Sequence, residues 1–360
     1  MFIESLELKK FRNYSSLNLS FDQGINIFYG DNAQGKTNIL EAIYLCGTTK
    51  SHKGSKDKDI IQFQENESHI RMILNKNNIR HKIDMHLKKN KTKGVAFDGL
   101  PIQKASEFFG IVNLVFFSPE DLNIIKNGPI ERRKFIDSEL CQLNKLYLLQ
   151  LINYNKVVIQ RNKLLKNLPF DNSLKDTLDL WDDQMVFYGM SLIEERENFI
   201  LQINKILKDI HLNLTGGKEK IQLVYEPNVT KEEFKKQLLQ GRDKDFKFKS
   251  SSIGPHRDDF CIRVNGIDIR KFGSQGQQRS AALSLKLSEI YFVKSMIKDK
   301  PAILMDDVLS ELDSSRQNYL LKSIECIQTF ITCTGMDKFI HDQFTVNKIF
   351  KIVNGTVQHQ

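Results

Sequence analysis

The sequence predicts an α/β fold whose core is interrupted by a helical insertion. Three observations predict it: a phosphate-binding loop at 30–37, an apolar run that ends in two carboxylates at 301–307, and a glycine-poor stretch between them. That stretch, from about 129 to 212, repeats apolar residues every three or four positions, which is typical of amphipathic helices. A length of 360 residues allows one large or two medium domains with sizeable cores.

The first part of the chain is expected to form mainly strands. Residues 1–29 and 68–117 alternate between apolar and polar side chains, as strands with one buried face do. Turn signals interrupt the second segment at 75–78, 89–91 and 98–99. After the helical stretch, a strand is expected at 221–227 and a helix at 230–240.

The phosphate-binding loop matches the pattern G-x-x-x-x-G-K-[ST]. Its glycines allow backbone N–H groups to curve around a phosphate, Lys36 would reach the β- and γ-phosphates of ATP, and the Thr37 hydroxyl would bind Mg²⁺. A β-rich run at 25–29 precedes the loop and a helical pattern at 38–45 follows it, so a chance glycine turn with a stray lysine is disfavoured. The ATP-binding residues expected here are Gly30, Asp31, Asn32, Ala33, Gln34, Gly35, Lys36 and Thr37.

The acidic strand end supplies the second half of this site. A continuous apolar run is typical of a buried parallel strand, and ligands bind at the carboxyl ends of such strands. Asp306 would hold the Mg²⁺ that Thr37 also binds, which is the Walker B role, and Asp307 would face an attacking water. The catalytic residues expected are therefore Lys36, Asp306 and Asp307. The alternative is a strand that simply ends at a polar turn.

A third motif, at 274–278, lies between the phosphate-binding loop and the acidic strand end, and a helical pattern follows it. It resembles the S-G-G-Q signature of ABC-type ATPases, with Gln275 where the first glycine usually stands. A serine and free N–H groups at a helix start attract anions. The signature residues are Ser274, Gln275, Gly276, Gln277 and Gln278, and a segment similar to the D-loop follows at Ser310, Glu311, Leu312 and Asp313. Thr334 stands where most ABC ATPases carry a switch histidine, which implies slow hydrolysis.

Further motifs occur along nearly the whole chain. They read Leu-Glu-Leu-Lys-Lys-Phe-Arg-Asn-Tyr at 6–14, Phe-Ser-Pro-Glu-Asp-Leu at 117–122, Arg-Arg-Lys-Phe-Ile-Asp at 132–137, Gln-Arg-Asn-x-Leu-Leu at 160–165, Gly-Pro-His-Arg-Asp-Asp at 254–259 and Leu-Met-Asp-Asp-Val-Leu-Ser-Glu-Leu-Asp at 304–313. Together they resemble the RecF family of bacterial DNA replication and repair proteins. The resemblance implies an ABC-ATPase head related to those of SMC proteins. Its lobe I, with the P-loop and a mixed sheet, would comprise 1–128 and 251–360, and its helical lobe II would be 129–250. No sustained heptads are present, so no long coiled coil is expected.

The resemblance also implies an activity. Two ATP molecules would join two protomers into a homodimer, the signature loop of each capping the ATP of the other, and slow DNA-stimulated hydrolysis would release them. Arg12 and Asn13, in the N-terminal motif, are expected to contribute to ATP binding. The dimer would clamp single- and double-stranded DNA at gaps and junctions in the cytoplasm, and with RecR and RecO it would promote RecA loading and SOS induction.

The charge suits an anionic partner without proving one. Lysines and arginines number 53 against 44 acids, which gives a net charge of +9. The basic residues occur in clusters, each of which could equally be a solvated face. From two of them we expect DNA contacts at Lys53, Lys56, Arg132, Arg133 and Lys134.

Two other classes of protein remain open. The P-loop is also used by the ATPase subunits of membrane transporters and by small-molecule kinases. The N-terminal motif and Thr334 argue against a transporter subunit, and the signature loop argues against a kinase, which has no use for a cap from a second chain. No uncharged apolar stretch of 18 residues is present, so no membrane span is expected, and none of the five cysteines forms a C-x-x-C pair that would predict a zinc site.

Overall fold

The computed structural model describes residues 1–168, 176–334 and 346–359, which form two compact units. Unit 1 comprises Met1–Asp121 and Val293–Gln360, and unit 2 comprises Leu122–Phe292. In the part of the chain that is described, no helix is long and apolar enough to cross a membrane.

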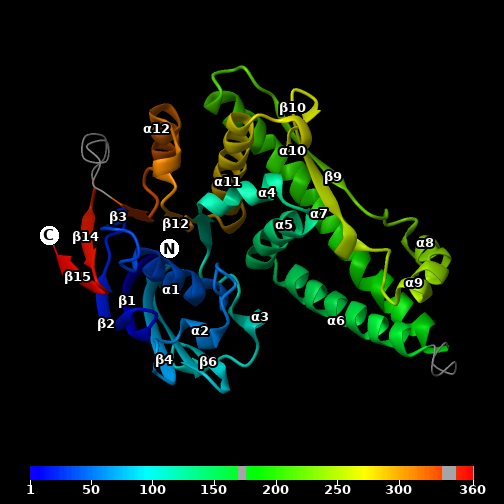
Figure 1. The fold of residues 1–360 in the computed structure, drawn as a ribbon, viewed down its shortest axis with the longest axis horizontal. Coiled ribbons are helices and arrows are strands. Elements are labelled where there is room, and N and C mark those ends of the chain that lie inside the picture. The colour runs from blue at the N-terminus through cyan, green and yellow to red at the C-terminus, as the bar shows by residue number, and fades with distance from the viewer. Residues whose placement is uncertain (169–175, 335–345, 360) are drawn as a thin grey trace. The chain divides into compact units, whose positions relative to one another are not determined.

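One sheet of unit 1 is antiparallel and contains the predicted N-terminal strands (Figure 1). Its order is β2-β1-β4-β5-β6-β7, with bounds β1 Phe2–Phe11, β2 Tyr14–Ser20, β4 Glu67–Lys76, β5 Ile79–Lys88, β6 Lys91–Phe97 and β7 Leu100–Pro101. Tight turns join β4 to β5 and β6 to β7 at Asn77-Asn78 and Asp98-Gly99. All four turn residues have positive φ, as two-residue hairpin turns require. These strands and turns confirm the sequence prediction.

The other sheet of unit 1 is mainly parallel and is built from distant parts of the chain. Its order is β15-β14-β3-β13-β12-β8, with bounds β3 Ile25–Tyr29, β8 Leu114–Phe117, β12 Ala302–Asp306, β13 Thr329–Cys333, β14 Lys348–Val353 and β15 Thr356–His359. Only β15 pairs antiparallel. The strands predicted at the phosphate loop and at the acidic run are therefore neighbours of one strand, β13.

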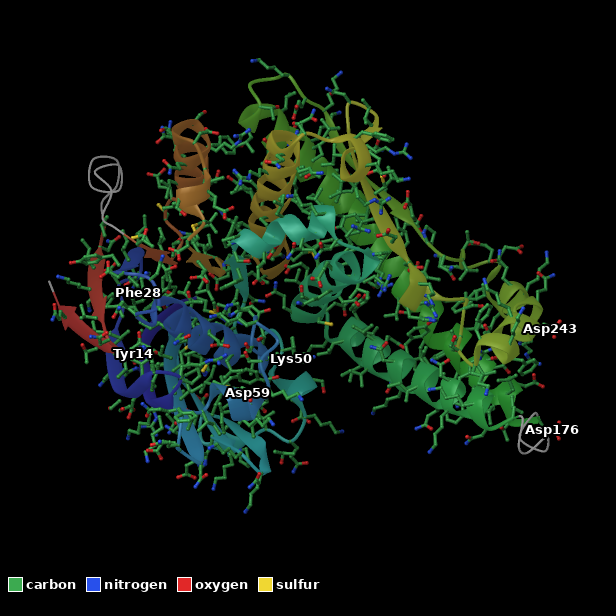
Figure 2. All side chains as sticks on the ribbon, in the orientation of Figure 1. Tyr14, Phe28, Lys50, Asp59, Asp176 and Asp243 are labelled. Carbon is green, nitrogen blue, oxygen red and sulfur yellow. The ribbon has the colours of Figure 1, made fainter. Side chains whose placement is uncertain are left out.

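The helix that follows the phosphate loop, α1 (Lys36–Thr48), lies in the core of unit 1. It contacts β4 of one sheet and β8, β12 and β13 of the other, so most of its residues are buried. The same core includes Tyr14 and Phe28, whose side chains are fully buried (Figure 2). The remaining short helices of unit 1 are α2 (Asp57–Ile60), α3 (Ala105–Phe108), η4 (Leu309–Glu311) and α12 (Ser314–Ser323), and η1 (Pro119–Leu122) ends where unit 2 begins.

Unit 2 is mainly helical, as the apolar spacing predicts. Its longest helices, α6 and α7, pack along each other (Figure 1). The helices are α4 (Asn123–Lys126), α5 (Pro129–Leu143), α6 (Lys145–Asn167), α7 (Leu178–Leu214), α8 (Phe234–Gln240), α9 (Arg242–Phe248), η3 (Pro255–Arg257), α10 (Ile269–Phe272) and α11 (Gln275–Ile297), the last of which runs into unit 1. A three-stranded antiparallel sheet, β11-β10-β9, joins them, with β9 at Ile221–Glu226, β10 at Asp259–Val264 and β11 at Ile267–Asp268.

The compact units do not coincide with the predicted parts 1–128, 129–250 and 251–360. The main difference is that residues 251–292, with the signature loop, belong to the helical unit. The reason is strand pairing: β10 pairs with β9 from Asp259–Glu226 to Val264–Ile221, which ties the segment to the insertion. A pairing between strands more than 30 residues apart leaves no local signal in the sequence.

Buried ion pairs explain several of the motifs in unit 2. Arg161 is fully buried and donates to Asp182 at 2.5 Å and to Asp245 at 2.6 Å. Arg196 donates to Asp258 at 3.1 Å, and burial raises the pKa of that carboxyl even though the arginine opposes the shift. Buried charges persist only when they are paired, so these motif residues are structural.

Candidate nucleotide-binding site

The phosphate loop runs from the end of β3 to the start of α1, which confirms the predicted strand–loop–helix context. Gly30 and Gly35 have φ of 149° and 110°, in the region that favours glycine. A Cβ at Gly35 would lie 2.4 Å from Nδ2 of Asn13, and one at Gly30 would lie 2.4 Å from the Ile352 carbonyl oxygen. Both positions therefore favour glycine, because a side chain would be strained at this φ and would clash with these neighbours.

Lys36 points back into the loop. Its ammonium donates to the carbonyl oxygens of Gly30 at 2.6 Å and Asp31 at 2.9 Å, and the residue is 4% exposed. The loop thus holds a buried positive charge within its own curve, beside the first N–H groups of α1. Both features favour an anion at this position.

Thr37 and Asp306 meet, although they are far apart in the sequence. The Thr37 hydroxyl donates to Oδ1 of Asp306 at 2.7 Å, and the Thr332 hydroxyl donates to the same oxygen at 2.8 Å. The parallel pairing of β12, β13 and β3 brings these residues to one edge of the sheet. A hydroxyl and one carboxylate suit Mg²⁺, which takes few protein ligands and completes its shell with phosphates and water.

Asp307 adopts an uncommon backbone conformation directly after β12. Its φ is 52°, and its N–H donates to the Thr332 hydroxyl at 3.0 Å. Burial raises the pKa of its carboxyl, the neighbouring Asp306 raises it further, and Lys36 lowers it. A positive φ in a non-glycine residue stores strain, and such strain occurs often at functional sites.

The segment similar to the D-loop follows on the surface of unit 1. The Ser310 hydroxyl donates to the Asp307 carbonyl oxygen at 2.7 Å, and Asp313 caps α12 by accepting from the Arg316 N–H at 3.1 Å. Glu311 is exposed and Leu312 is half-buried beside them. Thr334, at the position of the switch histidine, is exposed just after β13.

Arg12 and Asn13 brace the phosphate loop and α1. Arg12 forms a two-point ion pair with Glu41 of α1, at 2.8 and 2.7 Å, and also donates to the Ser55 hydroxyl. Asn13 donates to the Gln34 carbonyl oxygen at 2.9 Å. Glu41 is fully buried; burial alone would raise its pKa, but hydrogen bonds from Arg12 and a serine outweigh burial and lower it.

Two residues of this site escaped the sequence analysis. Glu41 is a carboxylate on an otherwise apolar helix face, and Thr332 is a hydroxyl inside an apolar strand. Each is a polar residue at a position where the pattern requires an apolar one. Buried polar groups need hydrogen-bond partners, so a polar residue at an expected core position indicates a contact with another polar group. This was the signal in the sequence that could have identified both residues.

The signature loop forms a capping box at the start of α11. The Ser274 Oγ accepts from the Gln277 N–H at 3.2 Å, and the Gln277 Oε1 accepts from the Ser274 N–H at 3.1 Å. Ser274, Gln275 and Gly276 are exposed, whereas Gln278 is buried and donates to the Ile269 carbonyl oxygen. The cap uses the acceptor side of the serine hydroxyl, and none of the described residues accepts a hydrogen bond from its O–H, which leaves it available for an outside anion.

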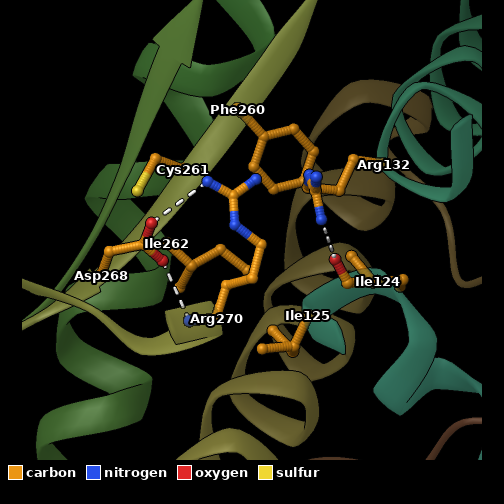
Figure 3. A pocket seen from close by; sticks show the side chains of 8 residues that line it. All are labelled: Ile124, Ile125, Arg132, Phe260, Cys261, Ile262, Asp268 and Arg270. Atoms are coloured by element: carbon orange, nitrogen blue, oxygen red, sulfur yellow. Dashed lines mark hydrogen bonds and ion pairs between the residues drawn. The ribbon is translucent and has the colours of Figure 1, made fainter. Parts of the chain in front are cut away.

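One of the five expected DNA contacts is wrong. Arg132 is 2% exposed and donates to Asp259 through two nitrogens. It also donates to the Ile124 carbonyl oxygen, and its side chain lies beside Phe260 (Figure 3). A buried guanidinium with these partners cannot reach a phosphate outside the protein. The sequence could not show this, because a lysine- and arginine-rich helix start looks the same whether its side chains point inward or outward.

The other expected contacts are more accessible. Lys53 and Lys56 are exposed in unit 1, and Lys134 is exposed in unit 2, with Glu131 at 3.9 Å. Arg133 is half-buried and donates to the Asp258 carbonyl oxygen at 2.6 Å.

The fold and these motifs define an ABC-type ATPase head of the kind found in SMC proteins. The family described as RecF/RecN/SMC N terminal domain matches residues 2–358. The chain belongs to the RecF branch of this family. It is 58% identical to the DNA replication and repair protein RecF of Lachnoclostridium phytofermentans over 99% of both chains, and 58% identical to that of Lachnospira eligens over 100% of both. The predicted family and fold class are confirmed.

Solved structures of RecF proteins support the same family assignment. A RecF–ATP structure of the RecFOR pathway matches with a TM-score of 0.93 and 34% identity over 100% of this chain and 97% of that one. A RecF–ATPrS structure matches with a TM-score of 0.92 and 35% identity over 99% and 98%. The Smc head of Pyrococcus furiosus, with a TM-score of 0.58 and 18% identity over 99% of this chain and 95% of that one, shares the fold alone. The transporter and kinase interpretations are not favoured.

Proposed function

We propose that this chain is an ATP-dependent DNA-binding protein of recombinational repair and replication restart. Its relatives are DNA replication and repair proteins, and two similar structures are of RecF with ATP or ATPrS. The observation that carries the proposal is the meeting of Thr37 with Asp306 at 2.7 Å beside the buried Lys36. A cation, a hydroxyl and a carboxylate close together are the groups that a bound magnesium triphosphate requires, and this supports the proposal.

Each residue of the site has a role in this proposal. Lys36 turns from the loop carbonyls to the β- and γ-phosphates, and Thr37 and Asp306 hold Mg²⁺. When bound, Mg²⁺ supplies positive charge to the phosphate oxygens. Asp307 orients the attacking water, and its raised pKa suits a group that must accept and return a proton. Arg12 and Asn13 keep the loop in shape and line its approach.

The ATP-bound form is a homodimer. The Ser274 hydroxyl and the first N–H groups of α11 of one protomer cap the γ-phosphate held by the other, so two ATP molecules join two chains symmetrically. Ser310, Glu311, Leu312 and Asp313 contribute to the same interface. Hydrolysis is slow, is stimulated by DNA, and releases the dimer.

The ligand of the dimer is DNA, single-stranded or double-stranded, at gaps and junctions. Lys53 and Lys56 of unit 1 and Lys134 of unit 2 are exposed and contact its phosphates, and the half-buried Arg133 of unit 2 adds a weaker contact. The protein acts in the cytoplasm. With RecR and RecO as partners it promotes RecA loading, and thereby SOS induction.

Size-exclusion chromatography tests the proposal. The chain is run with ATP, with ADP and without nucleotide, each with and without gapped DNA. A dimer that forms only with ATP and that retains DNA supports the proposal. A monomer under all conditions overturns the dimer, and phosphoryl transfer to a metabolite would favour a kinase.

A further inference from the structure

A chain of polar contacts connects the signature loop to the end of α7. The Gln277 Nε2 donates to Glu219 Oε1 at 3.0 Å. The second oxygen of Glu219 lies 3.3 Å from Nε2 of His211, and Nδ1 of His211 lies 2.9 Å from the Ser284 Oγ of α11. All four residues belong to unit 2. The contacts lead from α11 at Gln277 back to α11 at Ser284, with two hydrogen bonds and one close approach, between His211 and Glu219, that is within ion-pair distance but is not a hydrogen bond.

The chemistry of these contacts fixes the orientation of the Gln277 amide. Its oxygen faces the Ser274 N–H, which can only donate, and its NH₂ faces the Glu219 carboxylate, which can only accept. Rotating the amide by half a turn would place its NH₂ group against the Ser274 N–H and its oxygen against the Glu219 carboxylate, so both contacts would be repulsive. Glu219 thus holds Gln277 in the single orientation that closes the capping box.

His211 and Glu219 differ in burial. His211 is fully buried near the C-terminal end of α7, which is 37 residues long. Glu219 is 20% exposed and lies in the short segment between α7 and β9. A carboxylate in a connecting segment contributes little to the core, so its contact with Gln277 can be removed without unfolding the unit.

We propose that Glu219 is a positioning residue for the signature loop, supported by His211. It holds Gln277 so that the Ser274 backbone is capped and the serine O–H points away from the protein toward the partner protomer's ATP. His211 lies next to Glu219 and belongs to α7, so the support for the cap comes from the long helix of unit 2. This proposal rests on the proposed function, in which the loop acts in trans.

The test compares four variants with the wild-type chain. Glu219→Ala removes the contact, whereas Glu219→Gln keeps an acceptor for the Gln277 amide. Ser274→Arg blocks the loop itself. Glu226→Ala, which changes an exposed carboxylate at the end of β9, is the matched control. Each is measured for melting temperature, ATP affinity at concentrations where the chain is monomeric, ATP-dependent dimerisation and hydrolysis.

We expect Glu219→Ala to have the same melting temperature as the wild type. As a monomer it should also bind ATP with the same affinity. Its ATP-dependent dimerisation should weaken about tenfold, the order of effect of a hydrogen bond to a charged group. Glu219→Gln should restore most of this loss, and Glu226→Ala should match the wild type. If Glu219→Ala dimerises and hydrolyses like the wild type while Ser274→Arg does neither, the positioning role is overturned and the proposed function stands. If Ser274→Arg also behaves like the wild type, the trans arrangement itself fails.

Mixing experiments separate positioning from a general loss of stability. Glu219→Ala mixed with Lys36→Ala should recover hydrolysis, because one site of the mixed dimer combines an intact P-loop with an intact signature loop. Glu219→Ala mixed with Ser274→Arg should hydrolyse no more ATP than Glu219→Ala alone, because both changes affect the same side of the site. Recovery in the second mixture, or a fall in melting temperature that accounts for the whole loss of dimerisation, contradicts the proposal.

Discussion

Arg12→Ala should destabilise the nucleotide-binding unit by about 3 kcal/mol at neutral pH. The substitution removes both hydrogen bonds that Arg12 gives to Glu41 and leaves a fully buried carboxylate with the Ser51 hydroxyl as its remaining donor in the described contacts. Breaking a buried ion pair by removing one partner costs about 3–5 kcal/mol. We take the lower end because the arginine side chain is 21% exposed.

The pH dependence of this effect follows from the pKa of Glu41. In the wild type the pKa is lowered, so the pair stabilises the fold above the unfolded-state value of about 4.3 and this stabilisation is lost as the pH falls through the folded-state pKa. In the variant, burial without Arg12 raises the pKa, so protonation relieves the unpaired charge as the pH falls. The difference in stability between the two proteins should therefore shrink toward acid pH.

The assay is urea unfolding followed by circular dichroism, with hydrogen exchange of α1 as the local measure. Exchange is needed because the one tryptophan, Trp181, belongs to the other unit. Arg12→Ala combined with Glu41→Leu is the control, since removing both charges should recover most of the stability. A loss below about 1 kcal/mol that does not vary with pH would refute the reasoning. A fall in ATP affinity without any loss of stability would instead indicate direct contact with the nucleotide.

The other predictions concern the proposed site and the DNA surface. Lys36→Ala should abolish tight ATP binding, measured by calorimetry, while the circular dichroism spectrum stays unchanged; wild-type hydrolysis by this variant would rule out the P-loop assignment. Asp306→Asn should weaken Mg²⁺-dependent ATP binding, whereas Asp307→Asn should keep ATP bound and trap the dimer, and equal dissociation rates of this variant and the wild type would contradict the separate roles. DNA affinity should fall steeply as salt is raised, with a smaller slope for Lys53→Ala/Lys56→Ala, and an affinity insensitive to salt would count against phosphate contacts.

The phosphate loop could be predicted from the sequence because its requirements are local. Its glycines, lysine and threonine, and the strand and helix beside it, all lie within about 20 residues, and each has a steric or electrostatic reason to be there. Asp306 was equally predictable, because a continuous apolar run followed by an acid is a local pattern too.

The supports of the site could not be predicted in this way. Glu41 meets Arg12, and Thr332 meets Asp306, only after three segments of the chain have come together, and no local pattern specifies such a meeting. For the same reason the sequence did not distinguish the buried Arg132 from the exposed Lys134. Arg132 is buried because it pairs with Asp259, and Asp259 is held in place by the pairing of β10 with β9.

The sheet order has a consequence for how the protein is made. The P-loop strand β3 lies between β13 and β14, and the turn after β14 contributes the Asn354 N–H that binds the Gln34 side chain. A ribosome releases residues 25–37 long before residues 329–354, so the loop of a growing chain has no neighbouring strands to hold it. Unit 2, which is one uninterrupted segment, can complete its hydrogen bonding first. A nascent chain should therefore complete its helical unit before the strands that flank the phosphate loop are in place.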